Sequence, residues 1–445
     1  MFDPSDVSSG PTDGPASTIE RKAGIIPRRP LVPRCLLLLL ILAVALVSAC
    51  GATVAPSEAG VGPTATASPA PPIPTTTVGP ATATPSAAPT PTASPPASCA
   101  AVTLATLTEA QRIGQLFVLG LAKDRLDDAE RDAVATYHFG SMTFTTQTAA
   151  GVRAIRAITG AVQRLATPAS TGGVGFFIAA NQEGGLIQGL SGAGFDKIPS
   201  AVSQGALAPA TLRRDAARWG RQLSAAGVDL NFAPVADIVP AGTEDQNAPI
   251  GALRREYGHD PATASGHVAA FVAGMRDAGI ATTAKHFPGL GRVAGNTDVT
   301  ASVTDAVTVR DDPFLAPFAA AIKAGVPFVM VSLATYERID PEHLAVFSPT
   351  VIDGMLRGDL GFRGVVMSDA LGATAVAAIP PGTRAIDFLE AGGDMIISNQ
   401  VTPAIQMATA LATRAAASPS FRERIDDAAL RVLVAKQAAG LLDCG

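Results

Sequence analysis

Residues 285–305, KHFPGLGRVAGNTDVTASVTD, hold the densest group of side chains in this chain that could do chemistry. They follow the apolar run 278–284 and begin with a cation and an imidazole, Lys285 and His286. The chain then turns through a Pro-Gly pair into a polar, glycine-containing loop. A buried strand, then charged residues, then such a loop is how an α/β barrel builds one wall of an active site.

Other apolar runs also end in polar groups. Asn181 follows the run 176–180, Asp237 follows 228–234, and Asp369 follows 364–367. Carboxylates, amides and a lysine–histidine pair suit a polyhydroxylated ligand, because charged hydrogen-bonding groups orient hydroxyls. The sequence shows neither metal-ligand spacing nor a glycine-rich nucleotide fingerprint, so we expect no metal and no organic cofactor.

Eight short apolar runs alternate with segments of helical periodicity. The runs are 116–119, 139–144, 175–179, 228–234, 281–284, 327–331, 364–367 and 394–397. The predicted helices include 108–119, which opens with a capping-box sequence, 261–278, 313–324 and 382–391. Near-continuous apolar strands separated by helices indicate a parallel sheet. We predict an α/β fold, a (β/α)8 TIM-type barrel in one domain; a doubly wound open sheet is the alternative.

The first hundred residues have a different composition. An apolar run at 36–47 follows several arginines and is too short for a stable membrane span, so we predict a signal peptide over residues 1–50. Residues 51–98 are rich in Ala, Pro, Thr and Ser, and we predict a disordered tether there. The domain then covers 99–445.

The sequence before Cys50, Val-Ser-Ala, resembles a bacterial lipobox. The resemblance implies cleavage before Cys50 and lipid attachment to its thiol, so we expect an exported protein anchored by lipid to the outer face of the cell membrane. An uncleaved N-terminal anchor is the alternative. Cys99 and Cys444 lie at the two ends of the domain, and an exported protein can keep a disulfide between them. Two unpaired thiols are the alternative.

Four segments together resemble a known family: NQEGG (181–185), LNFAPVADI (230–238), KHFPG (285–289) and GVVMSDAL (364–371). They are similar to glycoside hydrolase family 3, and most to its single-barrel bacterial β-N-acetylglucosaminidases. The similarity runs in order from about 105 to 440. It implies a retaining, two-step hydrolysis of a terminal β-linked N-acetylglucosamine, which we expect to come from cell-wall (peptidoglycan) fragments.

The resemblance also implies roles for individual residues. Asp369 matches the nucleophile, although alone it could equally be the N-cap of a helix at 370–377. Lys285 and His286 match ligands of sugar hydroxyls, and Arg255 matches the arginine that grips the substrate, with its neighbour Arg254 leaving the register open by one. A further set is expected to complete the site: Asn181 as a sugar ligand and Asp237 as a carboxylate that holds the site together.

The sequence departs from the family pattern in two places. The first loop usually begins with Asp, and here it has the neutral Asn181. The family branch uses a loop histidine as general acid/base, with an Asp two residues earlier, but 292–305 contains no histidine. Asp298 matches that Asp and could itself be the acid, with burial raising its pKa. Otherwise a residue from elsewhere supplies the proton, or the protein binds sugar without efficient turnover.

Three functions therefore remain at this stage: a β-N-acetylhexosaminidase, a sugar-binding lipoprotein of the same fold, and a β-glycosidase or phosphorylase of different sugar preference. A net charge of −5 with 16% charged residues gives no basic face for nucleic acid. We expect a carbohydrate substrate, contact with the membrane through the lipid anchor, and a monomer.

Overall fold

The computed structural model describes residues 98–122 and 125–444. The predicted signal peptide with Cys50 and the predicted tether, except its last residue Ser98, lie outside these residues. No helix within the described part of the chain is long and apolar enough to cross a membrane.

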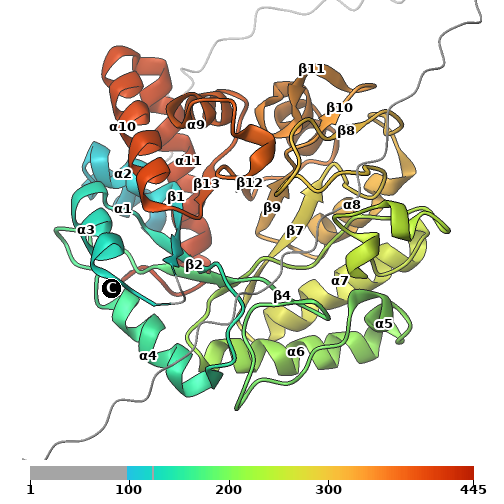
Figure 1. Cartoon of the computed structure of the whole chain (residues 1–445). Coiled ribbons are helices and arrows are strands. Elements are labelled where there is room, and N and C mark those ends of the chain that lie inside the picture. The colour runs from blue at the N-terminus through green and yellow to red at the C-terminus, as the bar shows by residue number, and fades with distance from the viewer. Residues whose placement is uncertain (1–97, 123–124, 445) are drawn as a thin grey trace, which may run out of the picture. The chain divides into compact units, whose positions relative to one another are not determined.

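Eight parallel strands close into a barrel (Figure 1). They follow one another around it in chain order: β1 (Phe117–Leu121), β2 (Ser141–Phe144), β3 (Phe177–Ala180), β6 (Leu230–Asn231), β7 (Ala281–Phe287), β9 (Phe328–Val331), β12 (Val365–Ala370) and β13 (Met395–Ser398). The first and last strands pair in parallel, which completes the ring. The predicted (β/α)8 barrel is confirmed, and the open-sheet alternative is wrong.

Helices surround the barrel and connect its strands. They are α1 (Cys99–Thr106), α2 (Glu109–Gln115), α3 (Asp128–Tyr137), α4 (Gly151–Gln163), α5 (Ala201–Gly205), α6 (Pro209–Ala225), α7 (Pro261–Asp277), α8 (Ala316–Lys323), α9 (Pro381–Glu390), α10 (Val401–Ala417) and α11 (Pro419–Ala438). A π-helical segment, Thr350–Asp359, takes the helix position between β9 and β12. Small strands decorate the loops: a hairpin of β4 (Gln182–Gly184) and β5 (Ile187–Gln188), and a sheet of β8 (Thr304–Asp305), β10 (Thr335–Tyr336) and β11 (Asp340–Leu344).

The strands are apolar on both faces because both faces are buried. Phe177 and Ala179 of β3 point into the barrel, whereas Ile178 and Ala180 pack against the outer helices. Inside the barrel, the rings of Phe177 and Phe328 meet edge to face with centroids 5.4 Å apart. This two-sided burial explains why the strands appear in the sequence as continuous apolar runs rather than alternating ones.

The first predicted helix, 108–119, is too long. Thr108 forms the expected capping box, since its hydroxyl accepts from the backbone N–H of Gln111 and the Gln111 side chain accepts from the N–H of Thr108. The helix, however, ends at Gln115, and β1 starts at Phe117. The apolar run was shared between the end of a helix and the start of a strand, which periodicity alone does not separate.

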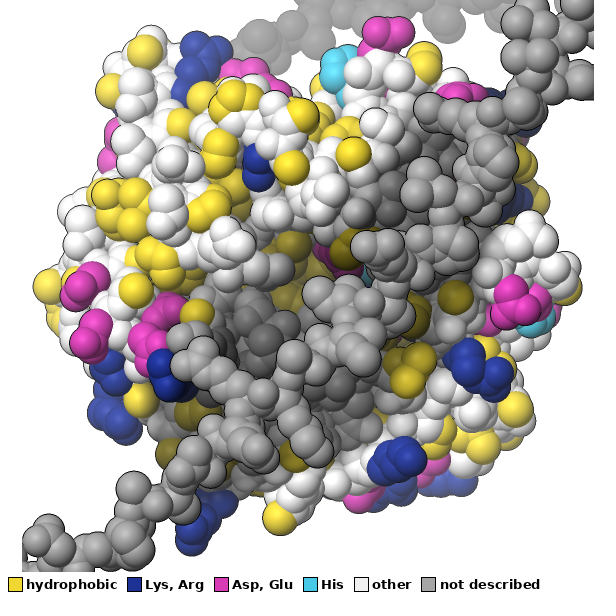
Figure 2. Space-filling view, in the orientation of Figure 1, with side chains coloured by type: hydrophobic (Ala, Val, Ile, Leu, Met, Phe, Trp, Pro, Cys, Tyr) yellow, Lys and Arg dark blue, Asp and Glu magenta, His cyan; other side chains and the backbone are white. Residues whose placement is uncertain are grey.

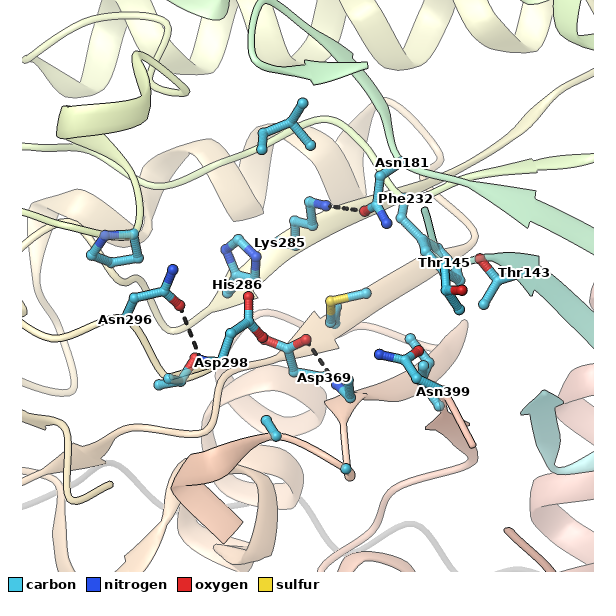
Figure 3. A pocket seen from close by; sticks show the side chains of 18 of the residues that line it. Thr143, Thr145, Asn181, Phe232, Lys285, His286, Asn296, Asp298, Asp369 and Asn399 are labelled. Atoms are coloured by element: carbon cyan, nitrogen blue, oxygen red, sulfur yellow. Dashed lines mark hydrogen bonds between the residues drawn. The ribbon is translucent and has the colours of Figure 1, made fainter. Parts of the chain in front are cut away.

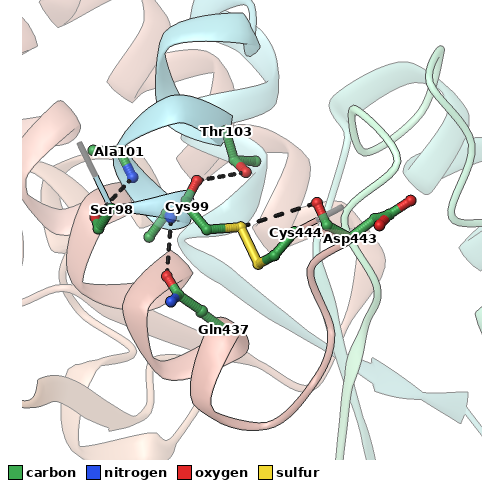
Figure 4. The surroundings of a disulfide bond; sticks show 8 residues. Ser98, Cys99, Ala101, Thr103, Gln437, Asp443 and Cys444 are labelled. Atoms are coloured by element: carbon green, nitrogen blue, oxygen red, sulfur yellow. Dashed lines mark hydrogen bonds between the residues drawn. A yellow bond between two sulfur atoms is a disulfide. The ribbon is translucent and has the colours of Figure 1, made fainter. Parts of the chain in front are cut away.

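The termini of the domain meet at the closed end of the barrel. The sulfur atoms of Cys99 and Cys444 form a disulfide, with Cα atoms 5.7 Å apart (Figure 4). The backbone N–H of Gly175, just before β3, donates to the carbonyl of Leu441. The C-terminal segment therefore crosses the end at which the strands begin, opposite the end at which they deliver their polar residues.

Lys436 of α11 is buried beneath the barrel. Its ammonium group donates to Gln115 Oε1 and to the carbonyl of Gly140, each at 2.7 Å. Burial lowers the pKa of Lys436 to about 7, and the carboxyl group of Asp229 opposes that shift only partly. Packing of α11 beneath the barrel therefore leaves the amine of Lys436 poorly solvated, which disfavours its charged form.

We expect the free energy of unfolding to depend on pH through Lys436. Between pH 7 and about 10.5 the folded protein binds fewer protons here than the unfolded chain, so stability rises with pH. Lys436→Met removes this slope. In urea unfolding at pH 7, 8 and 9, the wild type should gain on the variant by up to about 1.4 kcal/mol per pH unit. Asp229 has a pKa raised to about 6 by burial and titrates below this range.

The exposed Lys323 provides the control. Lys323→Met should leave the pH dependence of unfolding as it is in the wild type. Parallel curves for Lys436→Met and the wild type would contradict the prediction.

Candidate active site

A cavity of about 500 Å³ opens where the strands end (Figure 3). Its walls come from the ends of β2, β3, β7, β9, β12 and β13 and from the loops after β6 and β7. The structure brings most of the predicted site residues to this cavity: Asn181, Arg255, Lys285, His286, Asp298 and Asp369. Asp237 is buried behind the wall. Arg254 is exposed and does not line the cavity, so Arg255 is the arginine of the site.

Lys285 and His286 lie on a strand rather than in the loop after it, because β7 extends to Phe287. Lys285 donates from Nζ to Asn181 Oδ1 at 2.8 Å and contacts Glu183 Oε1 at 2.6 Å. Asn181 is thus held by the lysine and lines the cavity, as Figure 3 shows. A strand position fixes the ammonium group more firmly than a loop position would.

Glu183 joins the two cations of the site. Its carboxylate accepts from Arg255 Nε at 2.9 Å and from Arg255 Nη2 at 2.8 Å, a two-point pairing, in addition to its contact with Lys285. Burial alone would raise the pKa of Glu183, but the charges of Arg255 and Lys285 outweigh it and lower the pKa to about 2. This buried, ionised carboxylate fixes both cations in position.

Asp237 orients His286. Its Oδ2 lies 2.7 Å from His286 Nδ1, and its Oδ1 accepts from the backbone N–H groups of His286 and Leu290. Because a carboxylate accepts hydrogen bonds, the Nδ1 position of the ring is the donor to Asp237, and this contact fixes the orientation of the imidazole. The side chain of Asp237 therefore acts through His286 and does not itself reach the cavity.

Asp369 is the carboxylate of β12 at the cavity. Its Oδ1 accepts from the backbone N–H of Ala370, the next residue. The N-cap alternative is wrong, because no helix starts here: the next helical turn is Thr374–Val376, and Ala373 is at its N-cap position. Asp369 is held by a strand at the mouth of the barrel, facing the cavity.

Asp298 brings a second carboxyl group to the same cavity. Figure 3 shows it between His286 and Asp369. Burial, and then the charge of Asp369, raise the pKa of Asp298. The other carboxylate of this loop, Asp305, points elsewhere: it accepts from Val307 N–H, Thr308 N–H and the Thr308 hydroxyl, and so closes a turn.

The loop that carries Asp298 is fixed to the segment that follows Asp369. The carbonyl of Asp298 accepts from Thr374 N–H, and the carbonyl of Thr297 accepts from Ala375 N–H at 3.1 Å. The side chain of Asn296 accepts from the N–H of Asp298 at 3.0 Å. These contacts hold the two carboxyl groups next to each other.

The cavity-lining residues of the described chain include no other carboxyl group. Nor do residues 98–122 and 125–444 contain a group of three His, Cys, Asp or Glu side chains placed to hold a metal ion. What the site offers is a pair of carboxyl groups, one of which has a raised pKa, beside fixed cations, amides and an imidazole. That arrangement suits acid–base and nucleophilic work on a hydroxylated ligand.

Comparison with known proteins agrees with this geometry. Residues 108–435 match the family described as "Glycosyl hydrolase family 3 N terminal domain". The chain belongs to glycosyl hydrolase family 3. Within family 3 it is similar to a solved structure, the beta-N-acetylhexosaminidase of Beutenbergia cavernae DSM 12333, with 45% identity and a TM-score of 0.73 over 74% of this chain and 99% of that one.

Two further relatives are similar over part of their length. The beta-hexosaminidase of Stenotrophomonas maltophilia (strain K279a) is 37% identical over 49% of this chain and 66% of its own length. The family 3 beta-N-acetylglucosaminidase of Paenibacillus sp. str. FPU-7 is 31% identical, with a TM-score of 0.67, over 75% of this chain and 63% of that one.

Sequence reasoning missed Glu183 as a member of this family 3 site. The residue was visible in the motif NQEGG, two positions after Asn181. The signal that could have identified it is electrostatic: Lys285 and Arg255 were both expected in one pocket, and two cations buried together require a counter-ion.

Asn181→Asp is expected to strengthen substrate binding. A carboxylate at this position would accept a sugar hydroxyl as a charged group while keeping its contact with Lys285, and charged hydrogen bonds are roughly twice as strong as neutral ones. We expect KM for an aryl β-N-acetylglucosaminide to fall about three- to tenfold with kcat little changed. The measurement is steady-state kinetics of the purified protein.

Asn399→Asp is the matched control, because Asn399 is another amide that lines the cavity. It should not lower KM. An unchanged KM for Asn181→Asp, or an equal fall in both variants, would show that the contact with Lys285 does not govern sugar binding.

Proposed function

We propose that this protein is a retaining β-N-acetylhexosaminidase that removes terminal β-linked N-acetylglucosamine from cell-wall fragments. The observation that carries the proposal is the pair of carboxyl groups, Asp369 on a strand and Asp298 on a docked loop, in one cavity. Similarity to proteins named as beta-hexosaminidases supports the sugar specificity. The volume of about 500 Å³ is in the range of small-ligand sites.

Asp369 is the nucleophile in this mechanism. Its carboxylate attacks the anomeric carbon, the bond to the leaving oxygen breaks, and a glycosyl-enzyme forms. Asp298, whose pKa is raised by burial and by Asp369, gives its proton to the leaving oxygen. It then takes a proton from the water that releases the sugar from Asp369.

The remaining polar groups hold the sugar. Lys285, His286, Asn181 and Arg255 line the cavity and present donors and acceptors to its hydroxyls. Glu183 and Asp237 keep these groups in position from behind. Ground-state and transition-state binding both depend on this fixed geometry.

Attachment of the protein to the outer face of the membrane through Cys50 is part of the same proposal. The tether would let a monomeric enzyme reach wall fragments from its anchor. On the face shown in Figure 2, the Lys and Arg side chains of the described residues are scattered among acidic and neutral ones. That distribution fits a neutral carbohydrate substrate better than a polyanion.

The test uses the full chain, purified in detergent. It is given an aryl β-N-acetylglucosaminide, the matching β-glucoside, and a natural wall disaccharide with N-acetylglucosamine at its non-reducing end. Cleavage of the first and third with retention at the anomeric carbon, and not of the second, is the expected result. Preference for the β-glucoside would show that the enzyme is a β-glycosidase of different sugar specificity. Binding of N-acetylglucosamine without cleavage would identify a sugar-binding protein, for which the neutral Asn181 is the supporting feature.

A further inference from the structure

Asn247 is a buried amide between the two loops that complete the cavity. It is 2% exposed and lies in the segment after β6 that leads to Arg255. Asn247 does not line the cavity. Three residues near it do: Pro249, Leu253 and Leu290. None of the roles assigned above to the site uses this residue.

All the hydrogen-bonding capacity of the Asn247 side chain is used. Its Nδ2 donates to the carbonyls of Leu290 and Val293, both at 2.7 Å. Its Oδ1 accepts from the backbone N–H groups of Ile250 at 3.0 Å and Gly251 at 2.8 Å. An amide can make two donor and two acceptor bonds, and here all four are made to backbone groups.

The acceptor half of Asn247 supports Arg255. Ile250 and Gly251 open the helical turn Gly251–Leu253, which leads directly into Arg255. The N–H of Arg255 donates to the carbonyl of Ile250, and its Nη1 donates to the carbonyl of Pro249. A shift of this turn would therefore move the guanidinium group.

The donor half supports the loop of Asp298. Leu290 and Val293 form the start of that loop, and the N–H of Leu290 is held by Asp237. The N–H of Ala248 also reaches the carbonyl of Ala294. One side chain thus joins the loop that carries the substrate-gripping arginine to the loop that carries the second carboxyl group.

We infer that Asn247 is a positioning residue that sets the distance between Arg255 and Asp298 across the cavity. The kinetic test of this inference rests on the proposed hydrolase function. A carboxylate in place of the amide, Asn247→Asp, has the same shape but loses both donors, and the oxygen that replaces Nδ2 lies against the carbonyls of Leu290 and Val293. The two loops should then separate, while the rest of the barrel keeps its contacts.

The kinetic signature follows from what each loop carries. The Arg255 side should raise KM on every substrate, about tenfold. The Asp298 side should lower kcat/KM only where the leaving group needs a proton, because kcat/KM reports the first step. With the natural disaccharide, kcat/KM should therefore fall on the order of 10²-fold or more, since small displacements in a site cost about that much. With an activated aryl glycoside, kcat/KM reports a first step that needs little protonation, so it should show only the tenfold loss from the Arg255 side.

Two controls separate positioning from a loss of stability. Gln246→Glu makes the same amide-to-carboxyl change at the exposed neighbouring position and should leave both constants unchanged. In a double-mutant cycle, Asn247→Asp should have no further effect on kcat for the disaccharide once Asp298→Asn is present. If Asn247→Asp does not fold, judged by circular dichroism, Asn247→Ser replaces it, because serine introduces no charge.

The outcomes are distinct. Kinetic constants within twofold of the wild type for a folded Asn247 variant overturn the inference. So does an equal loss on both substrates that adds to that of Asp298→Asn, because that result indicates a general loss of structure. If the wild type cleaves neither substrate, the hydrolase proposal fails by itself. The inference is then decided by calorimetric binding of N-acetylglucosamine, which Asn247→Asp should weaken about tenfold through Arg255 and which Gln246→Glu should not.

Discussion

Asp369→Asn is expected to reduce kcat for an aryl β-N-acetylglucosaminide by roughly 10⁴- to 10⁶-fold, the scale of loss when a covalent nucleophile is removed. The amide has nearly the same size as the carboxylate but cannot attack the anomeric carbon. Because Asp369 lies on β12, whose other contacts remain, the variant should fold and still bind the sugar. The measurements are steady-state kinetics, thermal unfolding and calorimetric binding of N-acetylglucosamine.

Asp311→Asn, at an exposed carboxylate outside the cavity, is the control and should be fully active. Trapping gives a second check. A slow fluorinated substrate should leave a sugar attached to Asp369 in the wild type, found by mass spectrometry of the digested protein. A label on another carboxylate, or an Asp369→Asn variant with near wild-type kcat, would remove Asp369 from its proposed role.

Asp298→Asn is expected to separate substrates by their leaving groups. General acid catalysis contributes typically 10²- to 10⁴-fold, and we expect a loss of that size in kcat/KM for the natural disaccharide. An aryl glycoside with a good leaving group needs little protonation, so its first step should be nearly unaffected. Kinetics with both substrates give the ratio directly.

The pH dependence of activity provides an independent test of Asp298 as the acid. An acid acts only while it is protonated, so activity on the disaccharide is present below the pKa of Asp298 and is lost above it. Burial and the charge of Asp369 raise that pKa, which moves the alkaline limb to higher pH than an ordinary aspartate would give. In Asp298→Asn this limb should disappear.

The second step offers a rescue experiment. Water needs a base to attack the glycosyl-enzyme, but the azide anion does not. Added azide should therefore speed turnover of aryl glycosides by Asp298→Asn and yield a β-glycosyl azide, whereas the wild type should respond little. If azide has no effect and both substrates lose activity equally, the proton comes from a different group.

The sequence by itself determined the architecture and most of the polar residues of the site. Eight continuous apolar runs separated by helical segments were enough to predict the barrel, because strands buried on both faces need apolar residues at every position. Asp369, Lys285 and Asn181 follow or end such runs, and parallel strands deliver their ends to one edge. Chain order alone therefore placed them together.

Only the tertiary structure decided how these residues are paired. Glu183 and Arg255 are 72 positions apart, and Asn247 and Leu290 are 43 apart, so their contacts exist only after the barrel has closed. The same holds for Lys436, whose partners Gln115 and Gly140 come from the other end of the domain. A propensity or a periodicity describes one segment at a time. Ion pairs and buried amides depend on the distance between segments, and that distance is set by the closed barrel.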